Sequence, residues 1–222
     1  MKKVIFFVFS IVIVNNIFAH TGGNVEYTCP LCGRRFESYT QFSYTIFGQN
    51  LDLRRYGAAI IPSPIPKCIS CNFVFSDDFF SEEEIIVLKE KLKVNNIFEK
   101  EPDMPNHYYL AREAEIVNRD LVDIIWWFLS GVWENKDENL ENMLMNITIK
   151  YIDKLNEKSK SYNNYQLVKL DLLRRSGKFE EALALIEIIK TYGEFYNDYI
   201  IKIIDLQIEL IGNKNQDEHQ LP

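Results

Sequence analysis

The sequence predicts an α+β protein, in which a small β module precedes an all-α array of helical hairpins. Residues 20–80 hold four of the seven prolines and several short alternating apolar segments, a pattern typical of strands and turns. Residues 81–212 instead place apolar side chains at intervals of three and four, which is typical of helices. With 222 residues, 47% of them hydrophobic, the chain is long enough for one or two domains.

The composition limits the possible functions. Only three histidines are present, His20, His107 and His219, and we expect His107 to be a surface or packing residue. The sequence has no glycine-rich loop of the kind that binds phosphate. Multi-histidine metalloenzymes, histidine-dependent hydrolases and nucleotide-binding enzymes are therefore disfavoured. We expect a protein that is not an enzyme, with no catalytic residues and no residues that bind an organic cofactor.

Residues 1–19 have the layout of a secretory signal peptide. Lys2 and Lys3 form a basic start, an apolar run follows at 4–14, and Ala19 provides a small residue at the cleavage site. The run of 11 residues is shorter than the roughly 20 that span a membrane, although an uncleaved anchor remains an alternative. We expect an exported protein, periplasmic or secreted, with no membrane segment after cleavage.

The charge balance disfavours two classes of partner. The net charge of −7 becomes −9 when the signal peptide and its two lysines are removed. Residues 20–80 are neutral, with five basic and five acidic side chains. Nucleic acids and anionic lipids require a basic surface, so we expect neither as a partner.

Four cysteines in two pairs give the strongest chemical signal. Cys29 and Cys32 form one Cys-x-x-Cys motif, and Cys68 and Cys71 form the other. Each motif lets one tight turn direct two sulfurs at the same ion, and two such turns supply the four ligands of a tetrahedral Zn²⁺. The sequence therefore predicts a structural zinc ribbon with these four cysteines as metal ligands.

The surrounding residues fit this interpretation. Gly33 follows the first motif and Asn72 the second, and both residue types tolerate the positive φ of a chain that curls around a metal. The 35 residues between the motifs exceed the usual 15–20, so we expect the ribbon to carry an insertion. Segments 35–39 and 73–75 are predicted to leave the motifs as strands, and prolines hold 60–66 extended.

Two alternatives remain open for the cysteines. An exported protein enters an oxidising compartment, where four cysteines can form two disulfides in any of three pairings. The motif Cys29-x-x-Cys32 is also compatible with a thiol–disulfide redox protein. Such a protein needs the motif at the start of a helix, however, and residues 34–36 do not begin a helical apolar repeat.

The remaining residues predict a series of helices. Ser81 and Glu84 form a capping box before the first helix. The expected helices cover 81–94, 106–117, 121–133, 139–157, 165–175, a segment that begins at Phe179, and 195–211. The apolar face of the fourth helix is predicted to consist of Met143, Ile147, Tyr151 and Leu155. Residues 213–222 are polar and are predicted to form a disordered tail.

The fifth and sixth helices predict a tight antiparallel hairpin. Gly177 is suited to end the first helix in the left-handed conformation, and Ala182 lets the two helices approach closely. The segment 177–183 resembles the inter-helix turn of tetratricopeptide (TPR) repeats. Leu170 stands where that consensus prefers Gly and Ile189 where it prefers Ala, so an ordinary helical hairpin remains the alternative.

Several motifs together resemble a bacterial family of uncharacterised proteins, defined by a domain of unknown function. The resemblance covers most of 25–192 and rests on Cys29-Pro-Leu-Cys32-Gly33, Asp52-Leu-Arg54-Arg55-Tyr56-Gly57, 62–66, Cys68-x-x-Cys71 and 108–133. In that family a split CPxCG…CPxCG ribbon precedes TPR-like helices. This chain has Lys67 for the second motif's proline and Asn72-Phe73 for its Gly-Tyr, which leaves the ligands intact. The resemblance implies zinc and a helical scaffold, and no reaction.

We therefore expect an exported, non-enzymatic binding or scaffold protein, with a thiol–disulfide redox protein as the alternative. Stacked hairpins generate a surface suited to a protein or peptide partner. The acidic helical part favours basic partners. Candidate aromatic anchors, most of which we expect in the core, are Tyr108, Tyr109, Trp126, Trp127, Tyr192 and Tyr196.

Overall fold

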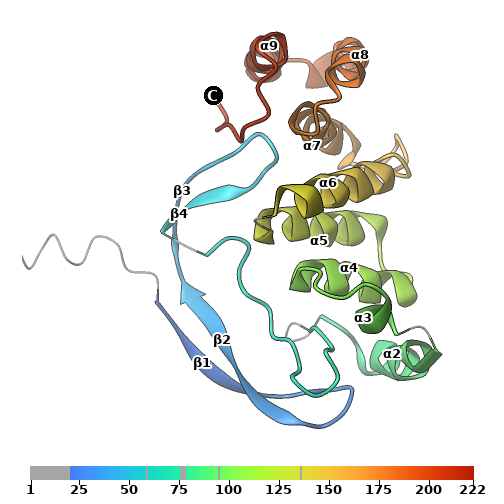
Figure 1. The fold of residues 1–222 in the computed structure, drawn as a ribbon. Coiled ribbons are helices and arrows are strands. Elements are labelled where there is room, and N and C mark those ends of the chain that lie inside the picture. Colours follow the sequence, from blue (N-terminus) through green and yellow to red (C-terminus); the bar gives the residue numbers. More distant parts are fainter. Residues whose placement is uncertain (1–20, 59, 76–78, 95, 136) are drawn as a thin grey trace, which may run out of the picture.

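The computed structural model of the protein describes residues 21–222 apart from 59, 76–78, 95 and 136. The expected signal peptide at 1–19 lies outside the described residues. The described part is α+β, as predicted: two small antiparallel sheets precede a column of helices and lie along one side of it (Figure 1). No helix in this part is both long and apolar enough to cross a membrane.

Two hairpins make up the β module. β1 (Thr21–Thr28) pairs with β2 (Arg35–Ser43) in an antiparallel sheet. β3 (Thr45–Gln49) follows almost at once and pairs with β4 (Arg55–Ala58). The second hairpin lies between the two cysteine motifs, where their spacing predicts an insertion.

Residues 73–75 do not form the strand that the sequence predicts. Val74 makes a single bridge to Lys67, and the N–H of Phe75 donates to the carbonyl of Pro66 at 3.2 Å. The chain doubles back here around the second cysteine motif, and the opposite residue Pro66 has no backbone N–H with which to continue a ladder.

The helices follow in chain order. They are α2 (Glu82–Val94), α3 (Ile97–Lys100), α4 (Asn106–Ile116), α5 (Leu121–Glu134), α6 (Glu138–Ile152), α7 (Tyr162–Arg175), α8 (Phe179–Ile189) and α9 (Asp198–Gly212). A short 3₁₀ turn, η1 (Gly193–Phe195), precedes the last helix. From α4 onward each helix packs against the next, so the column in Figure 1 grows in sequence order.

Local signals in the sequence place two helix ends correctly. The N–H of Ser81 donates to Oε2 of Glu84 at 2.8 Å, and the N–H of Glu84 donates to Oγ of Ser81 at 3.3 Å, which is the predicted capping box. Gly177 has φ of +73° and ends α7, so that α8 folds back against it. The predicted helical hairpin is therefore present.

The fourth predicted helix is too long, and its predicted apolar face is only partly correct. α6 ends at Ile152, and Met143 is 42% exposed, whereas Ile147 and Tyr151 pack against the core and Leu155 is buried beyond the helix. The fully buried side chains of α6 are Leu144, Met145, Thr148, Ile149 and Ile152. The reason is that α6 packs against both α5 and α7, so it buries two flanks rather than one narrow stripe.

The C-terminal residues also differ from the expected disordered tail. They return to the β module, where the N–H of Leu51 donates to the carbonyl of His219 and the N–H of Leu221 donates to the carbonyl of Gln49, both at 2.8 Å. A polar sequence forms an ordered segment here because a strand edge satisfies its backbone groups.

Candidate metal centre and adjoining cleft

The two cysteine motifs adopt the same backbone geometry. In the first, the N–H of Cys29 donates to the carbonyl of Arg34 at 2.9 Å, and the N–H of Gly33 donates back to the carbonyl of Cys29 at 2.8 Å. In the second, the corresponding bonds join Cys68 with Phe73 and Asn72 with Cys68, both at 2.8 Å. Gly33 and Asn72 have φ of +74° and +60°, as the sequence predicts.

This geometry brings all four sulfurs to one place. The four Sγ atoms lie within 4.8 Å of one another. Sγ of Cys29 is 3.7 Å from Sγ of Cys71, and Sγ of Cys32 is 3.6 Å from Sγ of Cys68. Both of these contacts join sulfurs of different motifs, so a bound ion would join the first hairpin to the loop 67–74.

These distances fit a metal better than a disulfide. In a tetrahedron with zinc–sulfur distances of about 2.3 Å, neighbouring sulfurs are about 3.8 Å apart. A disulfide requires about 2.05 Å. The four cysteines thus form a cluster that is able to hold a metal ion, and zinc is the ion that four thiolates select most often in such ribbons.

The thiols differ in their environments. Cys29 and Cys68 are buried, whereas Cys32 is exposed. Burial raises the pKa of the Cys29 thiol to about 11 and also raises the pKa of Cys71. A hydrogen bond from the backbone N–H of Arg34 lowers the pKa of Cys32 to about 7. Four thiolates so close together repel one another, so a cation among them is what allows all four to lose their protons.

Aromatic side chains pack against the centre. Phe75, four positions beyond the second motif, contacts Tyr27 edge-on at 5.8 Å and Phe36 at 6.0 Å between ring centroids. Phe73 stacks on Phe75 and also contacts Phe80, just before α2. The cluster joins the first hairpin, the second cysteine loop and the start of the helical column.

A buried glutamate fastens the second cysteine loop to the helices. Glu113 on α4 has no exposed surface, and its Oε1 accepts the N–H of Val74 at 3.2 Å. Its Oε2 has no hydrogen-bond partner among the described residues. Burial raises the pKa of Glu113 well above its usual value, because water cannot solvate the ionised carboxylate.

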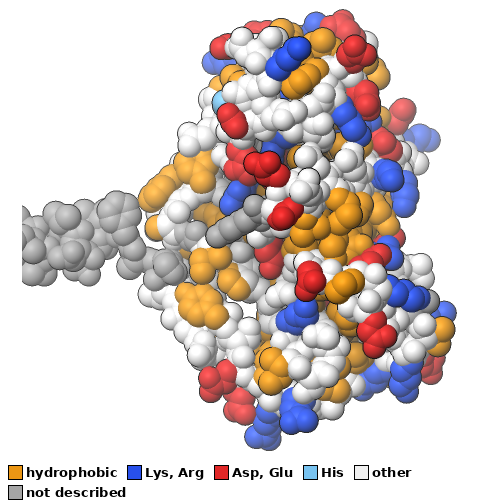
Figure 2. Space-filling model, viewed as in Figure 1, with side chains coloured by type: hydrophobic (Ala, Val, Ile, Leu, Met, Phe, Trp, Pro, Cys, Tyr) orange, Lys and Arg blue, Asp and Glu red, His pale blue; other side chains and the backbone are white. Residues whose placement is uncertain are grey.

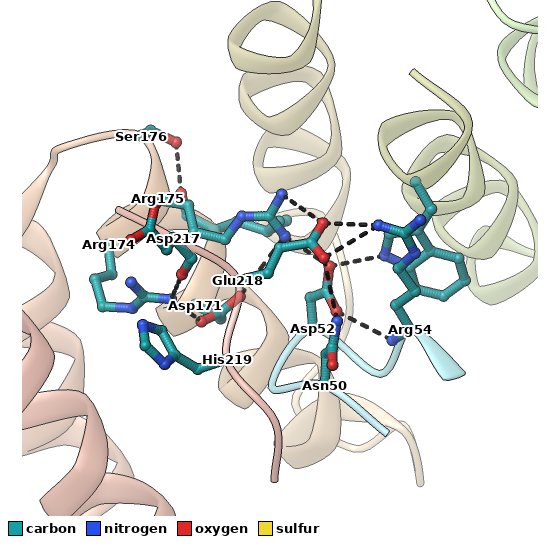
Figure 3. A network of polar contacts seen from close by, with 12 residues as sticks. Asn50, Asp52, Arg54, Asp171, Arg174, Arg175, Ser176, Asp217, Glu218 and His219 are labelled. Atoms are coloured by element: carbon teal, nitrogen blue, oxygen red, sulfur yellow. Dashed lines mark hydrogen bonds and ion pairs between the residues drawn. The ribbon is translucent and has the colours of Figure 1, made fainter. Parts of the chain in front are cut away.

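A second polar centre joins the β3–β4 turn to the helices at the other end of the module (Figure 3). Asp52, which is 1% exposed, accepts hydrogen bonds from Nε1 of Trp133 at 2.8 Å and from the guanidinium of Arg175 at 2.7 Å. Arg175 also pairs with Glu141 and Glu218. Burial, and then Asp171, raise the pKa of Asp52 to about 6, although Arg175 opposes the shift.

Arg174 extends this network to the C-terminal segment. Its side chain is fully buried and donates to Asp171, to Gln207 on α9, and to the backbone carbonyls of Asn215 and Asp217, at 2.6–3.0 Å. Glu218 in turn pairs with Arg54 at 2.8 Å. Figure 3 shows how the tail passes between α7 and the β3–β4 turn.

Between these two attachments lies a cleft of about 430 Å³. One wall comes from the hairpins, and includes Gln41, Tyr44 and Arg55. The other comes from α4, α5 and the segment 61–66. Figure 2 shows hydrophobic side chains on the hairpins and on the helices beside them, with the surface hollowed between them.

Four of the six predicted aromatic anchors lie in or against the core. Tyr108 and Tyr109 are buried, and Tyr192 and Tyr196 are partly buried and pack against the core. Trp126, which is 37% exposed, and Trp127 line the cleft together with Trp133. No local sequence pattern predicts the cleft, because its two walls are brought together only by the attachments at its ends.

The roles of several polar residues could not be predicted from the sequence. Glu113 and Asp52 are buried carboxyl groups whose partners are far away in the chain, and the motif that contains Asp52 does not indicate its burial. His107 is buried, as expected of a packing residue, but its Nδ1 lies 2.9 Å from Oε2 of Glu134 and its ring lines the cleft.

Comparisons with protein-family models, with curated proteins and with solved structures find no match to this chain.

Proposed function

We propose that the chain is an exported, non-enzymatic binding protein, in which a structural Cys₄ zinc site holds a β module against a TPR-like helical scaffold, and a surface of that scaffold binds a protein or peptide. The observation that carries the proposal is the convergence of four sulfurs within 4.8 Å. When bound, the ion would cross-link the two cysteine loops. Glu113 and the Asp52 network then attach the module to the helices at both ends.

The proposal makes zinc a structural component. Metal-binding energy is folding energy in such small modules, because no preformed site exists in the unfolded chain. The resemblance to the bacterial ribbon family supports the same assignment through the residues of its motifs. Export rests on the layout of residues 1–19 alone.

Intact mass spectrometry of protein purified from its native compartment tests the metal. The expected result is one zinc per chain under non-denaturing conditions and four alkylatable thiols after denaturation. A metal-free mass lower by about four hydrogens would instead establish two disulfides and contradict the proposal. Cys68→Ser should lose zinc, whereas the control Ser70→Ala, exposed in the same loop, should retain it.

A thiol–disulfide redox protein is the second candidate, because Cys32 is exposed and its pKa is lowered to about 7. Against it, the first motif leads into β2 rather than into a helix, and Sγ of Cys32 is close to Sγ of Cys68. The two functions differ in one variant. Cys29→Ser should unfold the β module if zinc is structural, but should abolish dithiol oxidation and leave the fold intact if the motif is redox-active.

A further inference from the structure

The cleft stays open because of the composition of one wall. Three prolines lie in 61–66, and proline has no backbone N–H to donate to a neighbouring strand. This segment is fixed to the helices instead, where Nδ2 of Asn106 donates to the carbonyl of Ile65 at 3.3 Å. β2 therefore has β1 along one edge, and along the other it forms no backbone-to-backbone hydrogen bond with any described residue.

The helical wall is aromatic. All three tryptophans of the chain, Trp126, Trp127 and Trp133, line the cleft. Trp126 and Trp133 are in edge-to-face contact at 5.2 Å, and Trp127 stacks on the ring of His107 at 5.7 Å. Fixed aromatic rings at the side of an open cleft favour binding of a large apolar side chain.

One buried polar atom at the cleft lacks a partner. Nε2 of Gln41 is buried and has no hydrogen-bond partner in the described part of the chain, while Oε1 of the same amide accepts the N–H of Ile60 at 2.8 Å. Buried polar atoms of this kind ordinarily find a partner, so this amide indicates a ligand with polar groups.

The charge of the cleft favours an anion. Arg55 lines it and forms no ion pair with any residue that the structure describes. No Asp or Glu is among the described residues that line the cleft. Glu134 lies behind His107 and is hydrogen-bonded to it. Burial acts to raise the pKa of Glu134, but its interactions with His107 lower that pKa by more, so it lies below its usual value. Glu134 is therefore ionised and engaged with the histidine.

We infer that the cleft binds an extended peptide segment that carries a large apolar side chain and a carboxylate. The peptide main chain would run beside the free edge of β2, the apolar side chain would lie on the tryptophans, and the carboxylate would pair with Arg55. The unpaired strand edge is what favours a peptide over a small aromatic acid, because main-chain hydrogen bonding along an edge is a general mode of peptide recognition. This inference rests on the proposed binding function and specifies its partner.

The inference differs from the sequence-based expectation of a basic partner. That expectation follows from the net charge of the helical part, whereas the cleft exposes a local positive charge. A short peptide responds to the groups within about a Debye length, roughly 8–10 Å at physiological salt, so the local charge should decide.

Selection from a library of acetylated, amidated random hexapeptides tests the inference on the zinc-loaded chain. The bound pool should be enriched in aromatic or large aliphatic residues together with Asp or Glu. Titration with a synthetic peptide from that pool should also change the tryptophan fluorescence of the protein, because all three of its tryptophans line the cleft. A pool that is not enriched, or is enriched in Lys and Arg, would overturn the inference.

Matched variants locate the binding. Arg55→Gln should weaken the selected peptide about tenfold and remove its preference over the same peptide with Gln for Glu. Arg35→Gln, an exposed arginine on the same module outside the cleft, should change neither. Trp126→Ala should weaken binding by about tenfold or more. Equal effects of the two arginine variants would place the peptide elsewhere and contradict the inference.

Two further measurements separate the possible failures. N-acetyl-phenylalanine binding as tightly as the peptide would show a small-molecule site and not a peptide groove. Zinc content and circular dichroism of each sample show whether the scaffold is intact. Peptide binding that fails on a zinc-loaded, folded chain refutes the peptide inference alone, whereas a folded chain without zinc refutes the proposed metal site.

Discussion

The carboxylate of Asp52 lies 2.7 Å from the guanidinium of Arg175, although 123 positions separate the two residues in the chain. Asp52 lies in the turn between β3 and β4, and Arg175 ends α7. Their contact fixes the upper end of the β module in Figure 1, while the bond from Val74 to Glu113 fixes the cysteine end. The cleft exists because the module is attached at two separate places.

Asp52→Ala should destabilise the protein strongly. The change leaves Nε1 of Trp133 without its acceptor and removes one of the carboxylate partners of the buried Arg175, and removing one partner of a buried ion pair costs about 3–5 kcal/mol. Urea unfolding should show a loss near the lower value, because Arg175 keeps Glu141 and Glu218. Asp153→Ala, which removes an exposed pair with Lys169, should cost less than about 1 kcal/mol. Similar losses in both variants would contradict this account.

Gly33→Ala should weaken zinc binding through backbone conformation alone. Gly33 has φ of +74°, and a Cβ there would meet no atom within 4 Å, so the substitution introduces no clash with the rest of the protein. Left-handed backbone costs an alanine about 1–2 kcal/mol, or roughly tenfold in zinc affinity. Competition with a chromophoric chelator measures the zinc affinity of each variant. The reverse change at the matching position, Asn72→Gly, should preserve or improve affinity, since φ there is +60°.

Glu113→Gln should stabilise the protein at neutral and higher pH. The pKa of Glu113 in the folded protein is raised above its unfolded value of about 4.3, so its contribution to stability is fully present below that pH and is lost as pH rises through the folded pKa. Glutamine keeps an acceptor for the N–H of Val74 and never ionises.

The free energy of unfolding, measured from pH 4 to 8, should therefore fall in the wild type relative to Glu113→Gln by about 1.4 kcal/mol per pH unit, until the folded pKa is reached. A control, Glu187→Gln, removes an exposed carboxylate and should show no such slope. A constant difference between wild type and Glu113→Gln across this range would mean that Glu113 stays ionised in the folded protein.

Deleting residues 214–222 should destabilise the chain by at least about 2 kcal/mol. The buried guanidinium of Arg174 would lose the carbonyls of Asn215 and Asp217, and hydrogen bonds of charged groups contribute about 1.5–3 kcal/mol each. The loss in the free energy of unfolding is measured by thermal and urea unfolding. Asp217→Ala keeps the backbone carbonyl and should change the free energy of unfolding little. A deletion variant as stable as the wild type would show that the tail does not support Arg174.

Structural features that depend only on neighbouring residues could be predicted from the sequence. The capping box at Ser81, the positive φ of Gly33 and Asn72, and the turn at Gly177 each depend on a few adjacent residues, and the structure has all of them. The second hairpin was not predicted in detail. Its strands are only five and four residues long, and β4 contains a glycine, so neither gives a clear alternating pattern.

The tail shows why a polar sequence does not define a flexible one. Residues 213–222 lack an apolar face, but their backbone carbonyls and carboxylates accept hydrogen bonds from Arg174, Arg54 and Leu51. No part of the tail sequence contains that information, because the complementary groups lie more than 150 positions away in one case and about 40 in the other.

The sequence by itself determined the order of a β module and a helical array, and it marked the four cysteines as one cluster, because helix periodicity, turn residues and ligand spacing are all local properties of the chain. Only the tertiary structure decided which sulfurs of the two motifs contact each other, which carboxyl and guanidinium groups are buried and where a cleft opens. Those features arise when distant segments are packed together, and their energies depend on burial and on partners that no local pattern specifies.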